Sequence, residues 1–196
     1  MAPLPALITR ENFKSFLESF DTVLTDCDGV LWHEDRLIGQ AHVTLNTLQA
    51  LGKKVFFVTN NSIKSRDDYI EKCGRLGFKA TKVCTGCVVR CVETVAERLA
   101  TVMGKPSTKM FSVIQEKNSL DPKRTLMIGD RCNTDILFGK NCGLQTLVVL
   151  SGVTTQADLE KWAASDDPEQ HALLADYCLT QLDDHLAFLD PKQEQK

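Results

Sequence analysis

The sequence lacks the features by which a protein enters a membrane or binds a polyanion. No apolar run reaches the roughly 18 residues that a membrane span requires. No block of Lys and Arg is present and the net charge is −3, whereas nucleic acids and acidic membrane surfaces are bound through clustered cations. Residues 1–13 have no basic segment ahead of an apolar one, so they do not resemble a secretory signal. We therefore expect a cytoplasmic protein that binds neither nucleic acid nor membrane.

Paired metal-binding cysteine motifs are also lacking. The eight cysteines are scattered through 196 residues, a length that needs no disulfides, and they are interpreted as reduced, small apolar residues. The CTGC segment at 84–87 could bind zinc or act as a redox pair, but no second CxxC or histidine pair completes a tetrahedral set. The histidines fall outside every motif described below and are expected to be solvated or packed. They are His33, His42, His171 and His185.

Short apolar runs alternate with helical patterns along the chain. This alternation predicts an α/β fold, a Rossmann-like parallel sheet with helices on both faces. One domain is expected over residues 1–190, followed by a disordered tail at 191–196. The predicted strands are TVLTD (22–26), VFFVTNN (55–61), TLMIGD (125–130), TLVVLSG (146–152) and YCLT (177–180). The predicted helices cover 40–51, 65–76, 86–102, 107–118 and 133–142, and a last one begins near Thr155.

Polar residues gather where three of these strands end. Asp26 and Asp28 end the first, the Thr-Asn-Asn of 59–61 ends the second, and Asp130 ends the third. Parallel α/β sheets bind ligands outside the carboxyl ends of their strands. The topology therefore predicts a pocket that brings the three groups together.

The acidic residues suggest a metal site. Asp26 and Asp28 are separated by one residue, and Gly29 allows a tight turn after them. Carboxylates so close raise a pKa within the pair unless a cation neutralises them. Mg²⁺ prefers oxygen ligands, and Asp130 can supply another carboxylate. Asp135 lies five residues further on, at the start of the next predicted helix.

A phosphate group could bind beside such an ion. Thr59, Asn60 and Asn61 offer a hydroxyl, side-chain amides and turn N–H groups. Lys105, in GKPS just before a predicted helix, offers a positive charge. A nucleophilic carboxylate, an acid/base carboxylate, a metal and phosphate-binding donors together predict phosphoryl transfer.

Four motifs in order resemble those of the haloacid dehalogenase-like (HAD) phosphatases. They are DCDGV at 26–30, VTNNS at 58–62, GKPS at 104–107 and GDRCNTD at 129–135. Their flanks, including DCDGVLW and LGKKVFFVTNNS, are similar to the 4-nitrophenylphosphatase branch, which includes phosphoglycolate and pyridoxal phosphate phosphatases. The resemblance covers roughly residues 20–155.

The resemblance implies a role for each site residue. Asp26 would attack phosphorus to form an aspartyl-phosphate, and Asp28 would protonate the leaving oxygen and later activate water. Mg²⁺ would be held by Asp26, the backbone carbonyl of Asp28, and Asp130. Asp135 would orient the metal shell or the lysine. The phosphoryl group would be bound by Thr59, Asn60, Asn61 and Lys105.

One departure from the family pattern concerns the cap. Members of this branch carry a large α/β cap domain between the second and third motifs, but here Ser62 and Lys105 are only 43 positions apart. The interval contains two helical patterns and a short link, KATKVCTGC (79–87), so a cap is expected to be missing near 82–84. The chain is either a naturally capless isoform or one whose cap was deleted by design, and the intact flanks favour deletion. We expect an open, poorly selective site and a monomer.

The sequence leaves the substrate open. A small phosphorylated metabolite such as phosphoglycolate or pyridoxal phosphate fits the resemblance, and so does a phosphoprotein. The same residues could run phosphomutase chemistry, or a capless chain could be a catalytically weak or dead phosphate-binding or interaction domain. Trp32 and His33 follow the catalytic turn and are expected at the pocket entrance.

Overall fold

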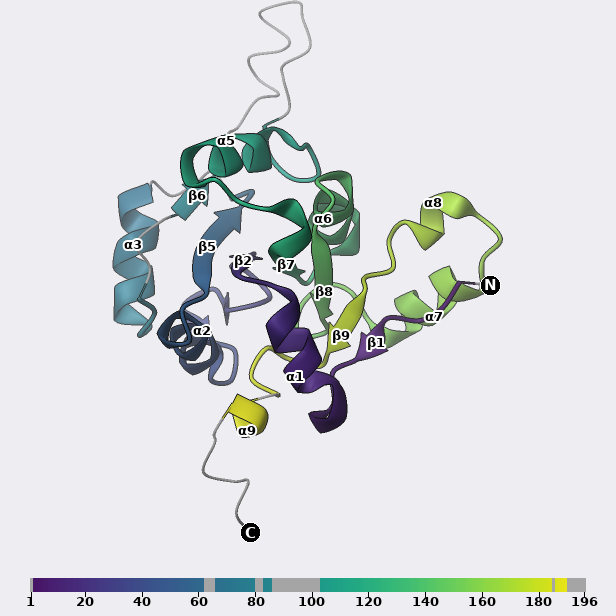
Figure 1. Ribbon diagram of the computed structural model, residues 1–196, viewed down its shortest axis with the longest axis horizontal. Helices are drawn as coiled ribbons and strands as arrows, with labels where there is room; N and C mark the ends of the chain where they lie inside the picture. Colours follow the sequence, from purple (N-terminus) through teal and green to yellow (C-terminus); the bar gives the residue numbers. More distant parts are fainter. Residues whose placement is uncertain (1, 62–65, 80–82, 86–102, 185, 190–196) are drawn as a thin grey trace, which may run out of the picture.

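The computed structural model describes residues 2–61, 66–79, 83–85, 103–184 and 186–189. Their centre is a seven-stranded sheet in the order β1-β9-β8-β7-β2-β5-β6, and every neighbouring pair is parallel (Figure 1). A two-stranded antiparallel hairpin lies outside it. The strands of the sheet are β1 (Ala6–Leu7), β2 (Thr22–Thr25), β5 (Lys54–Thr59), β6 (Val83–Thr85), β7 (Thr125–Gly129), β8 (Gln145–Val149) and β9 (Tyr177–Leu179). The hairpin consists of β3 (Trp32–His33) and β4 (Arg36–Leu37).

Helices cover both faces of the sheet because both faces are apolar. Successive residues of a strand point to opposite faces, and accordingly Val23 packs in one hydrophobic cluster and Leu24 in another. The first face is covered by α1 (Arg10–Ser19), α2 (Ala41–Ala50) and α3 (Arg66–Arg75). The second is covered by α5 (Lys109–Asn118), α6 (Leu137–Asn141) and α7 (Gln156–Ala164). Shorter helical segments are η1 (Pro122–Arg124), η2 (Cys132–Ile136), α8 (Pro168–His171) and α9 (Leu186–Leu189).

The predicted elements are present wherever the structure describes them. All five predicted strands form, and the last long helix begins after a capping box between Thr155 and Asp158. The predicted helix 133–142 begins as one π-helical turn, η2, before α6. The predicted helix 86–102, the tail 191–196 and the side chains of the CTGC segment lie outside the described residues. The five cysteines whose side chains are described are all free thiols, namely Cys27, Cys73, Cys132, Cys142 and Cys178.

Several short elements were not predicted. Strand β1 follows two prolines and has only two residues, too few for an alternating pattern. Strand β6 occupies the link in which the cap is expected to be missing, and it pairs with β5 at the edge of the sheet. The ten-residue helix α1 was not predicted either; it begins after Thr9, whose backbone N–H donates to Asn12 Oδ1 over 2.8 Å. Residues 83–85 of the link are therefore part of the sheet.

The register of the three central strands determines where the site lies. Thr25, the last residue of β2, is aligned with Ile128 of β7 and with Phe57 of β5. Asp26 therefore leaves the sheet level with Gly129 and Val58. The polar residues that follow each of these strands consequently emerge at one edge of the sheet.

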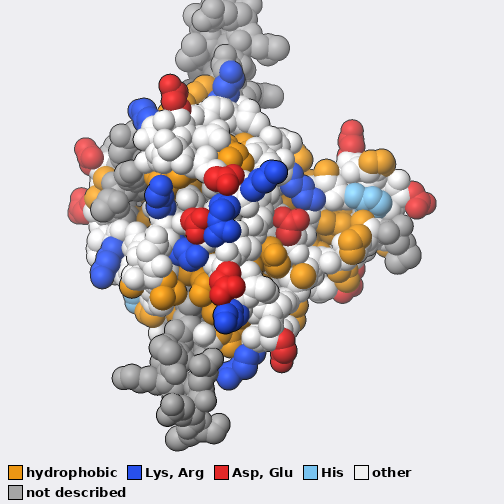
Figure 2. Space-filling model, in the orientation of Figure 1, with side chains coloured by type: hydrophobic (Ala, Val, Ile, Leu, Met, Phe, Trp, Pro, Cys, Tyr) orange, Lys and Arg blue, Asp and Glu red, His pale blue; other side chains and the backbone are white. Residues whose placement is uncertain are grey.

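The surface and the helices agree with the composition. Figure 2 shows Lys and Arg side chains interspersed with Asp and Glu over the face seen in Figure 1. Among the described residues, no helix is both long enough and apolar enough to cross a membrane.

Candidate active site

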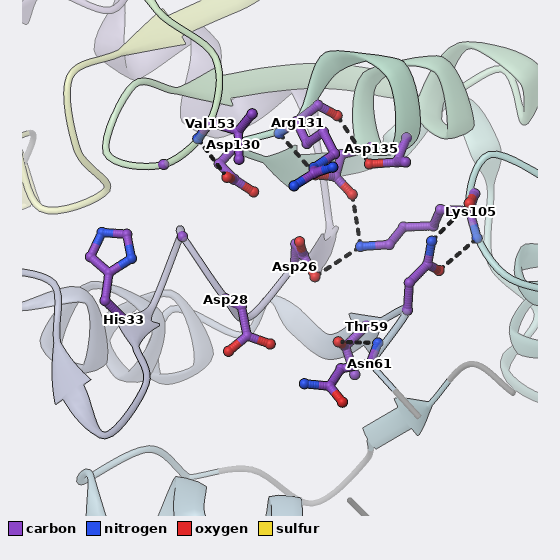
Figure 3. A pocket seen from close by; sticks show the side chains of 14 residues that line it. Asp26, Asp28, His33, Thr59, Asn61, Lys105, Asp130, Arg131, Asp135 and Val153 are labelled. Atoms are coloured by element: carbon purple, nitrogen blue, oxygen red, sulfur yellow. Dashed lines mark hydrogen bonds and ion pairs between the residues drawn. The ribbon is translucent and has the colours of Figure 1, made fainter. Parts of the chain in front are cut away.

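A pocket of about 510 Å³ opens at the carboxyl edge of β7, β2 and β5 (Figure 3). It contains side chains from all four sequence motifs. Four lining residues are exposed, so the pocket is open to solvent along that rim: His33, Asn60, Arg131 and Val153. The remaining lining residues are Asp26, Asp28, Gly29, Thr59, Asn61, Lys105, Asp130, Thr134, Asp135 and Gly152.

Asp26 is held at the end of β2 by its backbone. Its N–H donates to the carbonyl of Ile128 over 2.9 Å, and its carbonyl accepts from the Thr25 hydroxyl over 2.8 Å. The chain then turns at Gly29, whose φ is +86°. A Cβ at Gly29 would lie 2.4 Å from an oxygen of Asp130, so glycine is required both by conformation and by space.

Lys105 lies between two carboxylates in the floor of the pocket. Its Nζ is 2.9 Å from Asp26 Oδ1 and 2.7 Å from Asp135 Oδ1, and it also donates to the Val58 carbonyl over 2.9 Å. Burial opposes the charge on this lysine, but the two carboxylates outweigh burial and raise its pKa. Lys105 is therefore a permanent cation, held in one position.

Burial has the opposite consequence for Asp26. It raises the pKa of that carboxyl to about 7; Lys105 partly offsets this effect, and the charge of Asp135 adds to it. The pKa of Asp130 is raised by burial as well, with an opposing hydrogen bond from the Val153 N–H. Three carboxyls therefore lie close together beside one ammonium group, which pairs with Asp26 and Asp135. This imbalance of charge favours a further cation.

Asn60 positions Lys105. Its Nδ2 donates to the Lys105 carbonyl and its Oδ1 accepts from the Lys105 N–H, each over 2.8 Å. This reciprocal pair joins the end of β5 to the loop before α5 across 45 residues of sequence. The sequence predicted Asn60 as a phosphate ligand, but the structure places both ends of its amide on the lysine backbone.

The acidic residues form a group that could hold a metal ion. Asp26, Asp130 and Asp135 each offer a carboxylate oxygen, and these three atoms lie within 4.8 Å of one another. A Cβ at Gly152 would be 2.0 Å from Asp130 Oδ2, and one at Gly129 would be 2.1 Å from the Cβ of Asp135. Two glycines therefore make room for the acids. An all-oxygen donor set suits a hard cation such as Mg²⁺, so the residues fit the metal expected from the sequence.

Asp28 points elsewhere. In Figure 3 the Asp26 carboxylate faces Lys105, whereas the Asp28 carboxylate points away from it. Asp28 Oδ1 accepts from Trp32 Nε1 over 2.9 Å, and Oδ2 lies 3.4 Å from the Tyr69 hydroxyl. Its side chain is outside the acidic group, so any contact with a metal would come from its backbone carbonyl, as the resemblance implies.

The other predicted phosphate-binding residues line the pocket beside Asp28. Thr59 is buried, and its hydroxyl accepts from the Asn61 N–H over 3.0 Å, which closes a small turn after β5. In Figure 3, Thr59 and Asn61 lie below the Asp26–Lys105 pair. The structure therefore brings every predicted site residue to one pocket.

Several lining residues were not predicted. Gly152 and Val153 follow β8, the fourth strand that ends at this edge, and that position was a usable signal. His33 lies at the entrance as expected, with Nε2 2.9 Å from the Ser151 carbonyl. Trp32 was also expected there, but it is fully buried beneath Asp28. Tyr69 is brought to Asp28 by α3, a contact across 41 residues that no local pattern signals.

The comparison with protein families agrees with this geometry. The model described as haloacid dehalogenase-like hydrolase matches residues 23–130, more than half of the chain. A second, HAD-hydrolase-like model matches residues 102–178. Together the two matches contain every predicted site residue.

The curated relatives include several proteins named as phosphatases, and chronophin. Glycerol-3-phosphate phosphatase of Gallus gallus is 27% identical over 297 aligned residues, which cover 92% of this chain and 95% of that protein. Chronophin of Bos taurus is 42% identical over 106 residues, covering 54% of this chain and 35% of that one. The first alignment spans 297 positions, whereas this chain has 196 residues. Within the aligned region, on the order of a hundred residues of the chicken protein therefore face gaps in this chain.

Solved structures show the same fold. The 4-nitrophenylphosphatase from Thermotoga maritima aligns with a TM-score of 0.70 at 20% identity, covering 85% of this chain and 96% of that one. NagD from E. coli K-12 also aligns with a TM-score of 0.70, at 16% identity, over 85% of this chain and 98% of that one. This chain belongs to the haloacid dehalogenase-like hydrolase family, and its relatives include proteins named glycerol-3-phosphate phosphatase and phosphoglycolate phosphatase.

Proposed function

We propose that the protein is a Mg²⁺-dependent phosphatase that hydrolyses phosphate monoesters through an aspartyl-phosphate on Asp26. The observation that carries the proposal is the position of Lys105. Its ammonium group contacts Asp26 at 2.9 Å and Asp135 at 2.7 Å, beside the group of three acids. A carboxylate can attack a dianionic phosphate only where positive charge offsets the repulsion between them, and the pocket supplies such charge next to its best-placed nucleophile.

The metal site would be built from Asp26, Asp130 and the backbone carbonyl of Asp28, with Asp135 beside it. Mg²⁺ bound there would supply positive charge to the phosphoryl oxygens. Asp130 is held for this by the Val153 N–H, which donates over 2.8 Å, and by the close approach of Gly29 and Gly152. Asp135 accepts from the Arg131 N–H over 3.1 Å, so its other oxygen stays directed at Lys105.

The first half of the reaction transfers the phosphoryl group to the protein. An Asp26 oxygen forms a bond to phosphorus while the bond to the leaving oxygen breaks, and Asp28 gives its proton to that oxygen. Lys105, Thr59 and Asn61 bind the phosphoryl group during the transfer.

The second half regenerates Asp26. Asp28, now ionised, takes a proton from a water molecule as that water attacks phosphorus. The bond between phosphorus and Asp26 breaks, and inorganic phosphate leaves. Enzymes accelerate the hydrolysis of phosphate monoesters by up to about 10²¹-fold. General acid–base catalysis contributes about 10²–10⁴-fold of this acceleration, so Asp26, Lys105 and the metal must supply the remainder.

The open rim supports a second part of the proposal, that the chain lacks a cap. The alignment with the chicken relative leaves on the order of a hundred of its positions unmatched, and four exposed residues line the pocket. A site without a lid admits water and selects weakly among leaving groups. We therefore propose small phosphorylated metabolites as substrates, with low selectivity, and a monomeric protein. Phosphoproteins are an alternative substrate class that an open site also admits.

The decisive experiment compares the wild type with Asp26→Asn on 4-nitrophenyl phosphate, with Mg²⁺ and with a chelator. Loss of the nucleophile should lower kcat at least about 10³-fold. Removal of Mg²⁺ should abolish wild-type turnover. A wild type as slow as the variant would instead favour a phosphate-binding or interaction domain without catalytic activity. Transfer of phosphate to a second sugar phosphate rather than to water would favour a phosphomutase.

A further inference from the structure

We propose that Trp32 and Tyr69 are positioning residues that hold the carboxylate of Asp28 in place for proton transfer to the leaving group. This inference rests on the proposed function, in which Asp28 is the general acid, and it adds two residues outside the four sequence motifs that carry the chemistry. The juxtaposition behind it is an indole N–H on one oxygen of the Asp28 carboxylate and a phenol hydroxyl beside the other.

Trp32 provides the stronger of the two contacts. Its Nε1 donates to Asp28 Oδ1 over 2.9 Å, an ordinary hydrogen-bond length. The indole is fully buried and packs at 5.7 Å, edge to face, against the ring of Phe78. A donor fixed in the core cannot follow Asp28 if that side chain rotates, so it defines one position for the carboxylate.

Tyr69 contacts the second oxygen and links it to the phosphate-binding turn. Its hydroxyl lies 3.4 Å from Asp28 Oδ2, at the long end for a hydrogen bond, and it is also near the Thr59 side chain. Tyr69 is buried and its ring is 6.3 Å from that of Trp32. One hydroxyl thus lies between the proposed acid and a proposed ligand of the phosphoryl group.

Helix α3 supports both positioning residues, because it carries Tyr69 and also a lysine that contacts Trp32. Tyr69 and Lys72 are three residues apart and therefore share a face of the helix. Lys72 is buried, and its ammonium lies 4.4 Å from the centre of the Trp32 ring while it donates to the Glu34 carbonyl. Contact of a cation with an indole face is attractive, so α3 both supplies Tyr69 and holds Trp32.

A positioned general acid matters in proportion to how much the leaving group needs a proton. The 4-nitrophenolate ion is a stable leaving group, whereas unsubstituted phenolate is a stronger base and departs more easily once protonated. Loss of a residue that only supports the fold would slow both esters equally. Loss of one that aims Asp28 would slow the more basic leaving group selectively.

The experiment measures kcat/KM of the wild type and Tyr69→Phe on phenyl phosphate and on 4-nitrophenyl phosphate. This parameter reports the step in which the leaving group departs if that step is irreversible. We expect a loss of about tenfold on phenyl phosphate and of less than about threefold on 4-nitrophenyl phosphate, because the acid itself is worth 10²–10⁴-fold. Tyr177→Phe is the matched control, since it removes the chain's other tyrosine hydroxyl, away from the pocket.

A second measurement does not depend on turnover. The chain has two tryptophans, so its spectrum should contain two indole N–H resonances, which Trp162→Phe would assign. Asp28→Asn should move the Trp32 resonance upfield and leave that of Trp162 in place. An unmoved Trp32 resonance, or equal losses on the two esters, would overturn the inference while leaving the proposed function intact. A wild type that hydrolyses neither ester would overturn both.

Discussion

Strand β2 carries an acidic residue at each end, and the two have opposite environments. Asp21 precedes the strand and pairs with Arg124, which precedes β7; Asp26 follows the strand and pairs with Lys105. At the first end the side chains of Asp21 and Arg124 are 61% and 44% exposed. At the second end those of Asp26 and Lys105 are 15% and 1% exposed. The same strand therefore offers a matched comparison of one ion pair in water and one in the protein.

The pKa shifts of the two acids go in opposite directions. Hydrogen bonds from Arg124 lower the pKa of Asp21, which loses little hydration. Burial raises the pKa of Asp26 despite a lysine 2.9 Å away. An ion pair in water is well solvated and contributes little to the free energy of unfolding. A buried charge whose lost hydration is not fully compensated can instead bind a cation or react. Position along the strand, rather than residue type, separates a surface ion pair from a candidate nucleophile.

The largest expected effect comes from removing the buried cation. Lys105→Met should abolish hydrolysis and lower the free energy of unfolding by about 3–5 kcal/mol, because it leaves Asp26 and Asp135 buried without their partner. Arg124→Met is the matched control at the opposite end of β2. It should leave kcat unchanged and have a smaller, salt-dependent effect on stability. Denaturant unfolding and turnover of 4-nitrophenyl phosphate measure both, and equal effects of the two variants would break the comparison.

A smaller effect is expected from crowding one acid. Gly152→Ala would place a methyl group 2.0 Å from Asp130 Oδ2, so the carboxylate must move. We expect Mg²⁺ affinity to fall by about 10–100-fold, the usual cost of misorienting a ligand. Gly74→Ala, at a helical glycine with nothing within 4 Å, is the control and should leave the affinity unchanged. Titration calorimetry with Mg²⁺ gives both affinities; an unchanged value for Gly152→Ala would exclude Asp130 from the metal site.

The smallest effect concerns pH and distinguishes the two acids directly. The pKa of Asp26 is raised to about 7 in the folded, metal-free protein. Asp26 therefore contributes stability that is fully present when the pH is below the pKa of this residue in the unfolded chain, and that is lost as the pH rises through about 7. Mg²⁺ competes with that proton, so the increase in Tm caused by Mg²⁺ should grow from about pH 5.5 to about pH 8. Asp26→Asn should abolish most of this growth, whereas Asp21→Asn should preserve it. A pH-independent increase would contradict the raised pKa.

The sequence predicted the parts of the site that depend on strand ends. Asp26, Thr59 and Asp130 each follow an apolar run, and the rule for parallel sheets places such residues at one edge. The role of Gly29 could also be predicted from the sequence, because a turn directly after an acidic pair requires a flexible residue. These predictions needed only local pattern and general topology.

Other parts depend on contacts between distant segments. The amide of Asn60 binds the backbone of Lys105 across 45 residues. Residue type suggested a phosphate ligand at this position and could not predict that contact. Trp32 resembles a residue at the pocket entrance until the hairpin folds it under Asp28. Tyr69 reaches the acid only because α3 packs on the first face of the sheet. Side-chain direction at such contacts follows from packing, which no sequence period encodes.

The reciprocal amide pair between Asn60 and Lys105 has a consequence for how this family can vary. It fastens together the two ends of the interval between the second and third motifs, so both ends are anchored to the sheet whatever length of chain runs between them. We expect that residues can be inserted or deleted between Asn60 and Lys105 without displacing the lysine from Asp26. We therefore expect that accessory segments of different length can occupy this interval while Asp26 and Lys105 keep their positions.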